Sequence, residues 1–128
     1  MLSPEQFRRI ALGMQDAVER AHMGHPDFRV NGKIFATLYP DGERGMVTLT
    51  PDQQQELMRA DPAMFVPASG AWGRQGCTTV RLEAADESTV GEAMTLAWQH
   101  AAAQPVARRS KAPRSRTRAR PVRPPRQR

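Results

Sequence analysis

A predicted β-hairpin, Phe28–Tyr39, constrains the fold of this chain more than any other segment. Its two halves are rich in strand-forming residues. They flank Asn31-Gly32, a pair that readily adopts the positive φ angles of a two-residue hairpin turn. Strict alternation along the second half would put Ile34, Ala36 and Leu38 on one face, and Phe35, Thr37 and Tyr39 on the other. We therefore expect an antiparallel sheet built around this hairpin.

The segment before the hairpin predicts one long helix, from about residue 4 to residue 22. Ser3 can cap this helix, Pro4 suits its first position and Gln6 completes a capping box. Apolar residues then recur at helical spacing along one face: Phe7, Ile10, Ala11, Met14, Val18 and Ala21. Gly24 and Pro26 would end the helix, which would leave His22 at its carboxyl end.

After the hairpin, strands and helices alternate. The turn-rich segment Tyr39–Gly45 precedes a third strand, Met46–Leu49, and a second capping pattern at Thr50 starts a helix that ends near Ala60. The remaining elements are a short strand at Met64–Val66, a glycine-rich turn at Gly70–Gly76, a strand at Cys77–Leu82, and a helix capped by Asp86 that runs to about residue 103. The order is helix, three antiparallel strands, helix, two strands, helix, which is a two-layer α+β fold.

Charge divides the chain into two parts. Residues 1–104 contain nine basic and thirteen acidic residues, a net charge of −4, whereas residues 105–128 contain ten basic residues and no acid. The second part also has no aromatic residue and almost no apolar content, so it cannot bury a core and is expected to be disordered. We predict one α+β domain over residues 1–104, followed by a basic, Arg/Pro-rich tail over residues 105–128.

The tail predicts contact with nucleic acid. Its basic residues are Arg108, Arg109, Lys111, Arg114, Arg116, Arg118, Arg120, Arg123, Arg126 and Arg128. Arginine favours phosphate because the guanidinium group grips it through two hydrogen bonds. Backbone contacts of this kind read no base sequence, and we expect DNA as the partner more than RNA. The alternatives are a tail that only improves solubility and a tail that binds polyanions without purpose.

Four residues of the domain are candidates for additional contacts with the polyanion: Arg29, Lys33, Trp72 and Arg74. The simpler interpretation of Trp72 is that it packs over the edge of the sheet, and Arg29 and Lys33 could be ordinary solvent-facing residues of an edge strand. A second functional hypothesis is a protein-interaction or chaperone-like module that uses the sheet face and the Trp72 loop. We expect a monomer or a weak dimer.

The sequence favours no catalytic, metal or cofactor site. His22, His25 and Asp27 could be metal ligands, but the glycine and proline between and after the histidines would break the helix that aligns them. The segment Gly70–Gly76 lacks the Gly-Lys-Ser/Thr of a phosphate-binding loop. Cys77 opens a strand and is the only cysteine, which favours a small buried residue over a nucleophile. We therefore expect a protein that is not an enzyme.

The sequence also lacks the features of a membrane or exported protein. The first residues show no signal peptide, and no apolar run approaches the roughly 18 residues of a membrane span. We expect a cytoplasmic protein without membrane contact.

Three segments resemble one family. Phe28–Ala36, the turn Gly70–Gly73 and the strand region Gly76–Leu82 are similar, with their spacing, to the MmcQ/YjbR-like proteins. The resemblance covers roughly residues 3–103 and excludes the tail. It implies a helix, three strands, helix, two strands, helix arrangement like that of type III secretion chaperones and the frataxin-like group. Members are often labelled DNA-binding, but the resemblance brings no set of catalytic residues.

Overall fold

The computed structural model describes residues 1–104. In that part of the chain six strands form one antiparallel sheet in the order β1-β2-β3-β4-β6-β5. The helices are α1 (Pro4–Leu12), α2 (Pro51–Ala60), α3 (Gly70–Arg74) and α4 (Glu87–Ala102). The strands are β1 (Val18–His22), β2 (His25–Val30), β3 (Lys33–Leu38), β4 (Arg44–Thr48), β5 (Phe65–Pro67) and β6 (Cys77–Arg81). The predicted mixture of helix and antiparallel sheet is confirmed.

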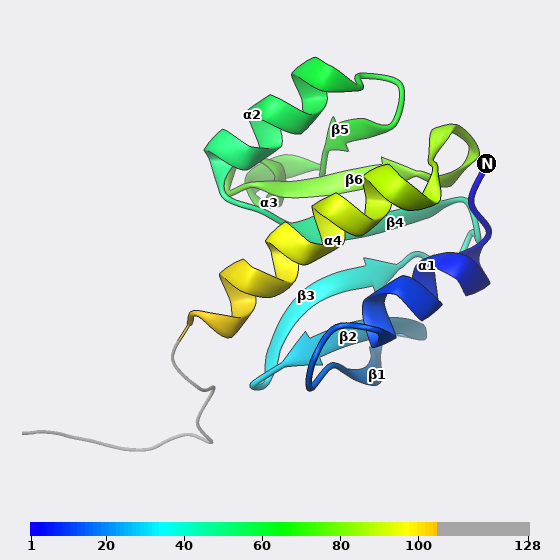
Figure 1. Cartoon of the computed structure of the whole chain (residues 1–128), viewed down its shortest axis with the longest axis vertical. Helices are drawn as coiled ribbons and strands as arrows, with labels where there is room; N and C mark the ends of the chain where they lie inside the picture. The colour runs from blue at the N-terminus through cyan, green and yellow to red at the C-terminus, as the bar shows by residue number, and fades with distance from the viewer. Residues whose placement is uncertain (105–128) are drawn as a thin grey trace, which may run out of the picture.

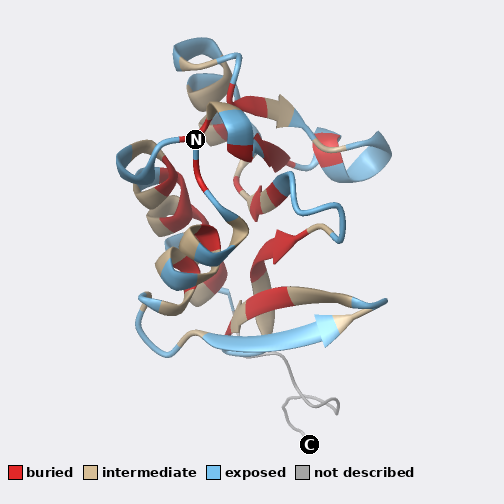
Figure 2. Ribbon diagram, turned by 90° about the vertical axis from the view of Figure 1, so that its right-hand side faces the viewer, coloured by how far each residue is buried: buried red, intermediate tan, exposed pale blue. Residues whose placement is uncertain are grey.

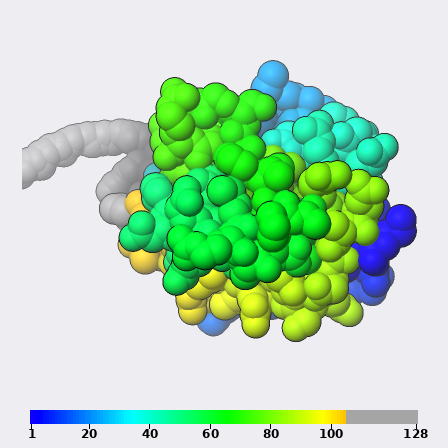
Figure 3. Space-filling view, turned by 90° about the horizontal axis from the view of Figure 1, so that it is seen from above, coloured from blue at the N-terminus to red at the C-terminus, as the bar shows by residue number. Residues whose placement is uncertain are grey.

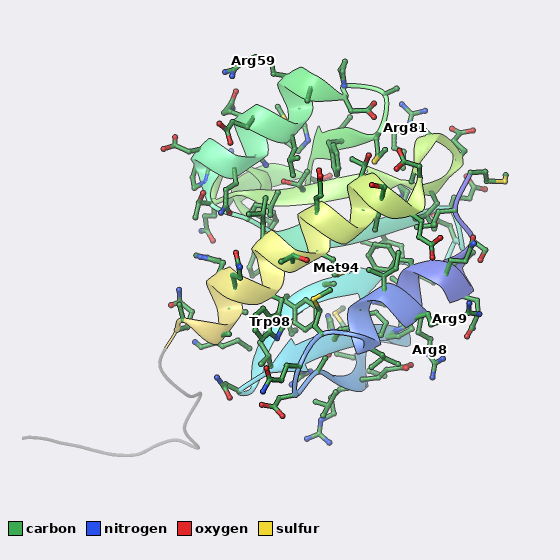
Figure 4. All side chains as sticks on the ribbon, viewed as in Figure 1. Arg8, Arg9, Arg59, Arg81, Met94 and Trp98 are labelled. Carbon is green, nitrogen blue, oxygen red and sulfur yellow. The ribbon has the colours of Figure 1, made fainter. Side chains whose placement is uncertain are left out.

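The helices α1 and α4 pack side by side on one face of the sheet (Figure 1). Phe7 of α1 meets Phe28 of β2 with their ring centroids 6.4 Å apart, and both residues are fully buried. The apolar stripe of α4 supplies Val90, Met94 and Ala97 to the same core, and Figure 4 shows Met94 between α4 and the sheet. The core therefore lies between these two helices and the sheet.

The first helix is much shorter than predicted. Its start is as expected, because Ser3 and Gln6 form the capping box. It ends at Leu12, however, and the chain turns through Asp16, whose φ of 62° no α-helix contains. Residues 18–22, predicted as helix, form the edge strand β1 instead. Four strands, not three, therefore precede α2.

Contacts distant in sequence explain this change. Every residue of β1 lies opposite a residue of β2, from Val18 opposite Arg29 to His22 opposite His25. Glu19 of β1 accepts a hydrogen bond from Nε of Arg8 on α1 at 2.6 Å, and Nε1 of Trp98 on α4 donates to the Gln15 carbonyl oxygen at 2.9 Å. Strand pairing and these anchors outweigh the helical periodicity of residues 14–21.

The predicted hairpin is confirmed. Strands β2 and β3 are joined by Asn31 and Gly32, with φ angles of 54° and 78°. The predicted faces are only partly correct, because Phe28 lies opposite Ala36 whereas Arg29 lies opposite Ile34. Phe35 is therefore the extra residue of a β-bulge. The bulge lets Phe35 and Ala36, which are neighbours in sequence, both enter the core, where each is fully buried.

The segment between β4 and β6 contains α2, β5 and α3, and β5 is an edge strand of the sheet. The predicted second helix is confirmed as α2, with a capping box between Thr50 and Gln53. The predicted turn at Gly70–Gly76 contains a short helix, α3, which is a correction. The buried Gln54 of α2 joins these parts, because its Nε2 donates to the carbonyl oxygens of Gly73 and Cys77, both at 3.0 Å.

The N-terminal residues lie against the end of β6. The backbone N–H of Leu2 donates to the carbonyl oxygen of Leu82 at 2.9 Å, and Figure 3 shows the dark-blue N-terminal residues beside the yellow-green segment that follows β6. The predicted last helix is confirmed as α4, capped by Asp86. Among residues 1–104, no helix has the length and hydrophobicity needed to cross a membrane.

Candidate functional site

The face of the sheet that points away from α1 and α4, here called the open face, concentrates positive charge. Residues directly opposite each other on neighbouring strands lie on the same face. The registers therefore put four arginines (Arg20, Arg29, Arg44 and Arg81), two histidines (His22 and His25) and one carboxylate (Asp27) at open-face strand positions. Residues 1–104 as a whole carry more acids than bases. The strands thus place cations on this face against the overall balance of the domain.

Asp27 lies at the centre of a buried ion network on the open face. Its side chain is fully buried, and its carboxylate accepts hydrogen bonds from Nε of Arg29 at 2.7 Å, from Nη2 of Arg29 at 3.1 Å, and from Nδ1 of His22 at 2.6 Å. The hydrogen bond from Arg29 is the main cause that lowers the pKa of Asp27, with His22 adding to it. The carboxylate also orients the His22 ring so that its Nε2 is the nitrogen left for other contacts.

Five planar side chains cross one end of the open face, one from each of five neighbouring strands or strand ends. We call them the cross-strand row: His22, His25, Tyr39, Arg44 and Arg81. The ring centroids of His22 and His25 are 4.7 Å apart, those of His25 and Tyr39 are 6.2 Å apart, and the guanidinium carbon of Arg44 lies 4.6 Å from the Tyr39 centroid. Arg81 lies directly opposite Arg44. The ring planes are tilted to each other, by 59° between His22 and His25 and by 43° between His25 and Tyr39.

A cavity of about 860 Å³ adjoins the Arg44–Arg81 end of the row. The strands β4 and β6 contribute Arg44, Thr79 and Arg81 to its lining, and the other lining residues are 1–4, 42, 43, 66, 67, 69, 82 and 83. Figure 4 places Arg81 at the end of the sheet where the chain begins. Two of the lining residues are carboxylates, Glu43 and Glu83, and they reduce the positive charge of this cavity.

Comparison with known proteins identifies the family. The family model described as YjbR matches residues 12–100, which is more than half of the chain. The chain belongs to the YjbR family. The predicted resemblance is thus confirmed, and the matched range contains the whole cross-strand row.

Two solved structures share the fold of this YjbR chain. A Deinococcus radiodurans protein with a DUF419 domain is 18% identical over 77% of each chain, with a TM-score of 0.63. A Pseudomonas syringae protein is 16% identical over 77% of this chain and 97% of its own, with a TM-score of 0.62. No curated protein matches the chain. At these identities the neighbours establish the fold of the YjbR domain alone.

The body residues predicted to contact a polyanion come from three elements of this YjbR domain: Arg29 from β2, Lys33 from β3, and Trp72 and Arg74 from α3. Arg29 is held by Asp27, and Lys33 begins β3 at the opposite end of the strands from Arg81. Arg74 is exposed on α3, and no ion-pair partner for it is seen within residues 1–104. The ten predicted tail residues, Arg108 to Arg128, lie outside the described residues. Arg8, Arg9 and Arg59 project from α1 and α2 (Figure 4).

The simpler interpretation of Trp72, that it packs over the edge of the sheet, is wrong. The residue is 68% exposed. Cys77 is buried as expected, and burial raises the pKa of its thiol, which disfavours the nucleophilic thiolate.

His22, His25 and Asp27, the three residues considered as metal ligands, are neighbours in the structure. They lie together because β1 pairs with β2, and not at the end of a helix as the sequence predicted. Asp27 is engaged by Arg29 and His22. Within the part of the chain that the structure describes, no three His, Cys, Asp or Glu side chains are placed to hold a metal ion.

Tyr39, Arg44 and Arg81 are the members of the row that were not among the predicted candidate residues. Tyr39 and Arg44 lie in the turn-rich segment Tyr39–Gly45, which turn chemistry alone could explain. The period-two pattern that links Tyr39 to Thr37 was a usable signal. The alternating pattern does not reach His22, because the helical periodicity of residues 18–22 predicts a helix there.

Proposed function

We propose that this YjbR-family protein is a non-enzymatic protein that associates with nucleic acid, DNA more than RNA, mainly through phosphate contacts of the basic residues 105–128. One observation carries the proposal: ten basic residues within 24 positions, with no acid among them. A phosphate backbone is the abundant cellular partner with matching charge density, and neutralising its charges releases counterions, which drives binding.

The open face supports the proposal from the domain side. Its strands carry four arginines and a single carboxylate, and that carboxylate is already neutralised by Arg29 and His22. Arg44 and Arg81 each pair with an acid in a turn, Asp41 at 2.8 Å and Glu83 at 3.2 Å, but about half of each arginine side chain stays exposed. Exposed pairs of this kind are weak, so phosphate can compete for both guanidinium groups.

Salt titration of the full chain and of a chain ending at Gln104 tests the proposal. We expect the full chain to bind a labelled duplex with an affinity that falls steeply with salt, at a log–log slope that would reach about −9 if all ten charges met phosphates. The shorter chain should bind at least about 100-fold more weakly at 50 mM salt, because it lacks these contacts. Fluorescence anisotropy over a range of salt concentrations measures both.

Replacement of all ten tail cations by glutamine in the full-length chain is the matched control, since it keeps the length and removes the charge. It should reproduce the affinity of the chain ending at Gln104. Equal binding by the full and shortened chains, or an affinity independent of salt, would disprove the proposal.

The second candidate function is a protein-interaction module, favoured by the exposure of Trp72. A tryptophan with 68% of its surface in water, next to the exposed Arg74, is the composition of an interaction hot spot. Chaperone-like activity would use this short helix and the adjoining sheet face to hold a partner chain.

Replacing Trp72 with alanine tests this second function. We expect a protein partner captured by the full chain to bind about 30-fold more weakly, the factor for a hot-spot residue, with little loss of stability because the side chain is exposed. Gln75→Ala, at an exposed position three residues away, should leave the interaction unchanged. Retention of every captured partner by the Trp72→Ala protein would exclude this surface.

A further inference from the structure

The cross-strand row follows one line of register across the sheet. His22 lies opposite His25, the backbone N–H of Tyr39 donates to the Arg44 carbonyl oxygen at 3.0 Å, and Arg44 lies opposite Arg81. Successive members of the row therefore come from adjacent strands, which lie about 4.8 Å apart in any sheet. All of them are on the open face, where neither α1 nor α4 covers them.

The row brings two like charges together at one end, Arg44 and Arg81. Two arginines directly opposite each other on antiparallel strands repel. Their carboxylate partners, Asp41 and Glu83, lie in the adjoining turns and not between them. The side chains of His22, Arg44 and Arg81 are 40%, 51% and 49% exposed, and His25 and Tyr39 between them are half-buried. An anionic ligand lying across the row would relieve this repulsion.

We propose that the cross-strand row is a platform on which the bases of single-stranded nucleic acid stack. Imidazole, phenol and guanidinium planes all stack on nucleobases, and this stacking is tolerant of base sequence. The spacing between strands lets consecutive unstacked bases meet consecutive side chains. The bases of a duplex are already stacked and cannot meet the row, so the row selects single strands.

The surroundings of the row fit the same ligand. The cavity of about 860 Å³ next to Arg44 and Arg81 has room for the backbone or a base beyond the row, with the Thr79 side chain on its wall. At the other end, Asp27 fixes the orientation of His22 through the 2.6 Å hydrogen bond to Nδ1. A ring that is oriented before binding loses less conformational entropy when a base stacks on it.

This inference rests on the proposed association with nucleic acid and adds the form of the ligand. The test uses the full chain, so that contacts of residues 105–128 are present in every measurement. The probes are a labelled 12-nucleotide oligothymidine and a 12-base-pair duplex, compared by fluorescence anisotropy at one salt concentration. The variants are Tyr39→Ala, which removes the ring, and Tyr39→Phe, which keeps it. Arg44→Lys is added because it keeps the charge and removes the planar group.

We expect Tyr39→Ala to weaken binding of the single strand by about five- to 150-fold, the range for loss of one stacked base, and to change duplex binding less than about twofold. Tyr39→Phe should bind both probes like the unaltered chain, because stacking needs the ring and not the hydroxyl. Arg44→Lys should weaken the single strand more than the duplex, because the duplex loses only part of a phosphate contact whereas the single strand also loses a stacking plane. Thermal unfolding of each variant shows whether it is folded. If Tyr39→Ala is unfolded, the binding of Arg44→Lys tests the platform in its place.

The possible failures are distinguishable. If the unaltered chain binds the duplex but Tyr39→Ala and Arg44→Lys both bind the single strand normally, the platform is wrong and the association with nucleic acid stands. Equal weakening of both probes in folded variants also overturns the platform, since it indicates a charge effect. If the unaltered chain binds neither probe, both the proposed function and the platform are overturned.

Discussion

Replacing Gly76 with alanine is expected to lower the free energy of unfolding by roughly 3 to 5 kcal/mol, combining backbone strain with a steric clash. Gly76 has a φ of 110°, a conformation that residues with a side chain rarely adopt. A Cβ atom built there would lie 2.0 Å from the carbonyl oxygen of Leu49. The backbone cannot shift easily, because the Gly76 carbonyl accepts hydrogen bonds from the Leu49 N–H at 3.2 Å and from the Thr78 hydroxyl at 2.8 Å.

The control for this prediction is Gly91→Ala in the middle of α4. No heavy atom lies within 4 Å of a Cβ built there, so the variant should be about 0.5 to 1 kcal/mol more stable than the original chain. Urea and thermal unfolding measure both variants, and Gly76→Ala should lower the midpoint of thermal unfolding by at least about 12 °C. A midpoint for Gly76→Ala within a few degrees of the original would contradict the assigned clash.

Replacing Asp27 with asparagine is expected to cost about 3 kcal/mol, because removing one partner of a buried ion network leaves the others uncompensated. The carboxylate has no solvent exposure, and it holds both Arg29 and His22. Asp41→Asn is a closely matched control. Asp41 binds Nε of Arg44 at 2.8 Å, much as Asp27 binds Nε of Arg29 at 2.7 Å, but the Asp41 side chain is 37% exposed. It should cost much less than Asp27→Asn, because exposed ion pairs contribute little to stability.

The two aspartates also predict a dependence on pH. The pKa of Asp27 is lowered in the folded chain, chiefly by Arg29. Its contribution to stability is therefore complete above the unfolded carboxyl pKa of about 3.9 and is lost as the pH falls through the lower, folded pKa. The difference in stability between the original chain and Asp27→Asn should be constant from pH 7 to pH 5 and shrink below pH 4. Equal costs for Asp27→Asn and Asp41→Asn, or a difference that grows in acid, would show that the network is not as described.

Local chemistry explains why much of the fold was predictable. The Asn31-Gly32 turn and the capping boxes at Ser3 and Thr50 involve residues at most three positions apart, and each has the predicted structure. The helix α4 was predictable for the same reason, since its stripe and its cap lie within one segment. Contacts of this range are present in the sequence itself and need no knowledge of the rest of the molecule.

The elements that were not predictable depend on partners far away in the chain. Residues 18–22 have helical periodicity, yet they become β1 because β2 offers them hydrogen bonds; Figure 2 shows β1 as the pale-blue strand at the lower edge, with little burial to mark it. The bulge at Phe35 arises from packing and not from turn residues. The cross-strand row depends on both the strand β1 and the bulge. His22 belongs to the row because residues 18–22 form β1, and Tyr39 belongs to it because of the register of β3. The candidate site was therefore beyond local patterns, although its residues are all visible in the sequence.

The position of the cross-strand row relative to α4 predicts that binding affinity depends on the length of the ligand. The row lies at the end of the sheet where Tyr39 and Arg44 meet, whereas α4 ends on the side of the turn between β2 and β3 (Figure 1). A six-residue strand such as β3 spans about 20 Å. If nucleic acid binds as proposed, a mononucleotide would reach only one of the two contacts, whereas a longer strand would reach both the row and the basic residues 105–128. The domain and the basic segment would then behave as two linked modules, and affinity would rise steeply once a ligand is long enough to raise the effective concentration of the second contact.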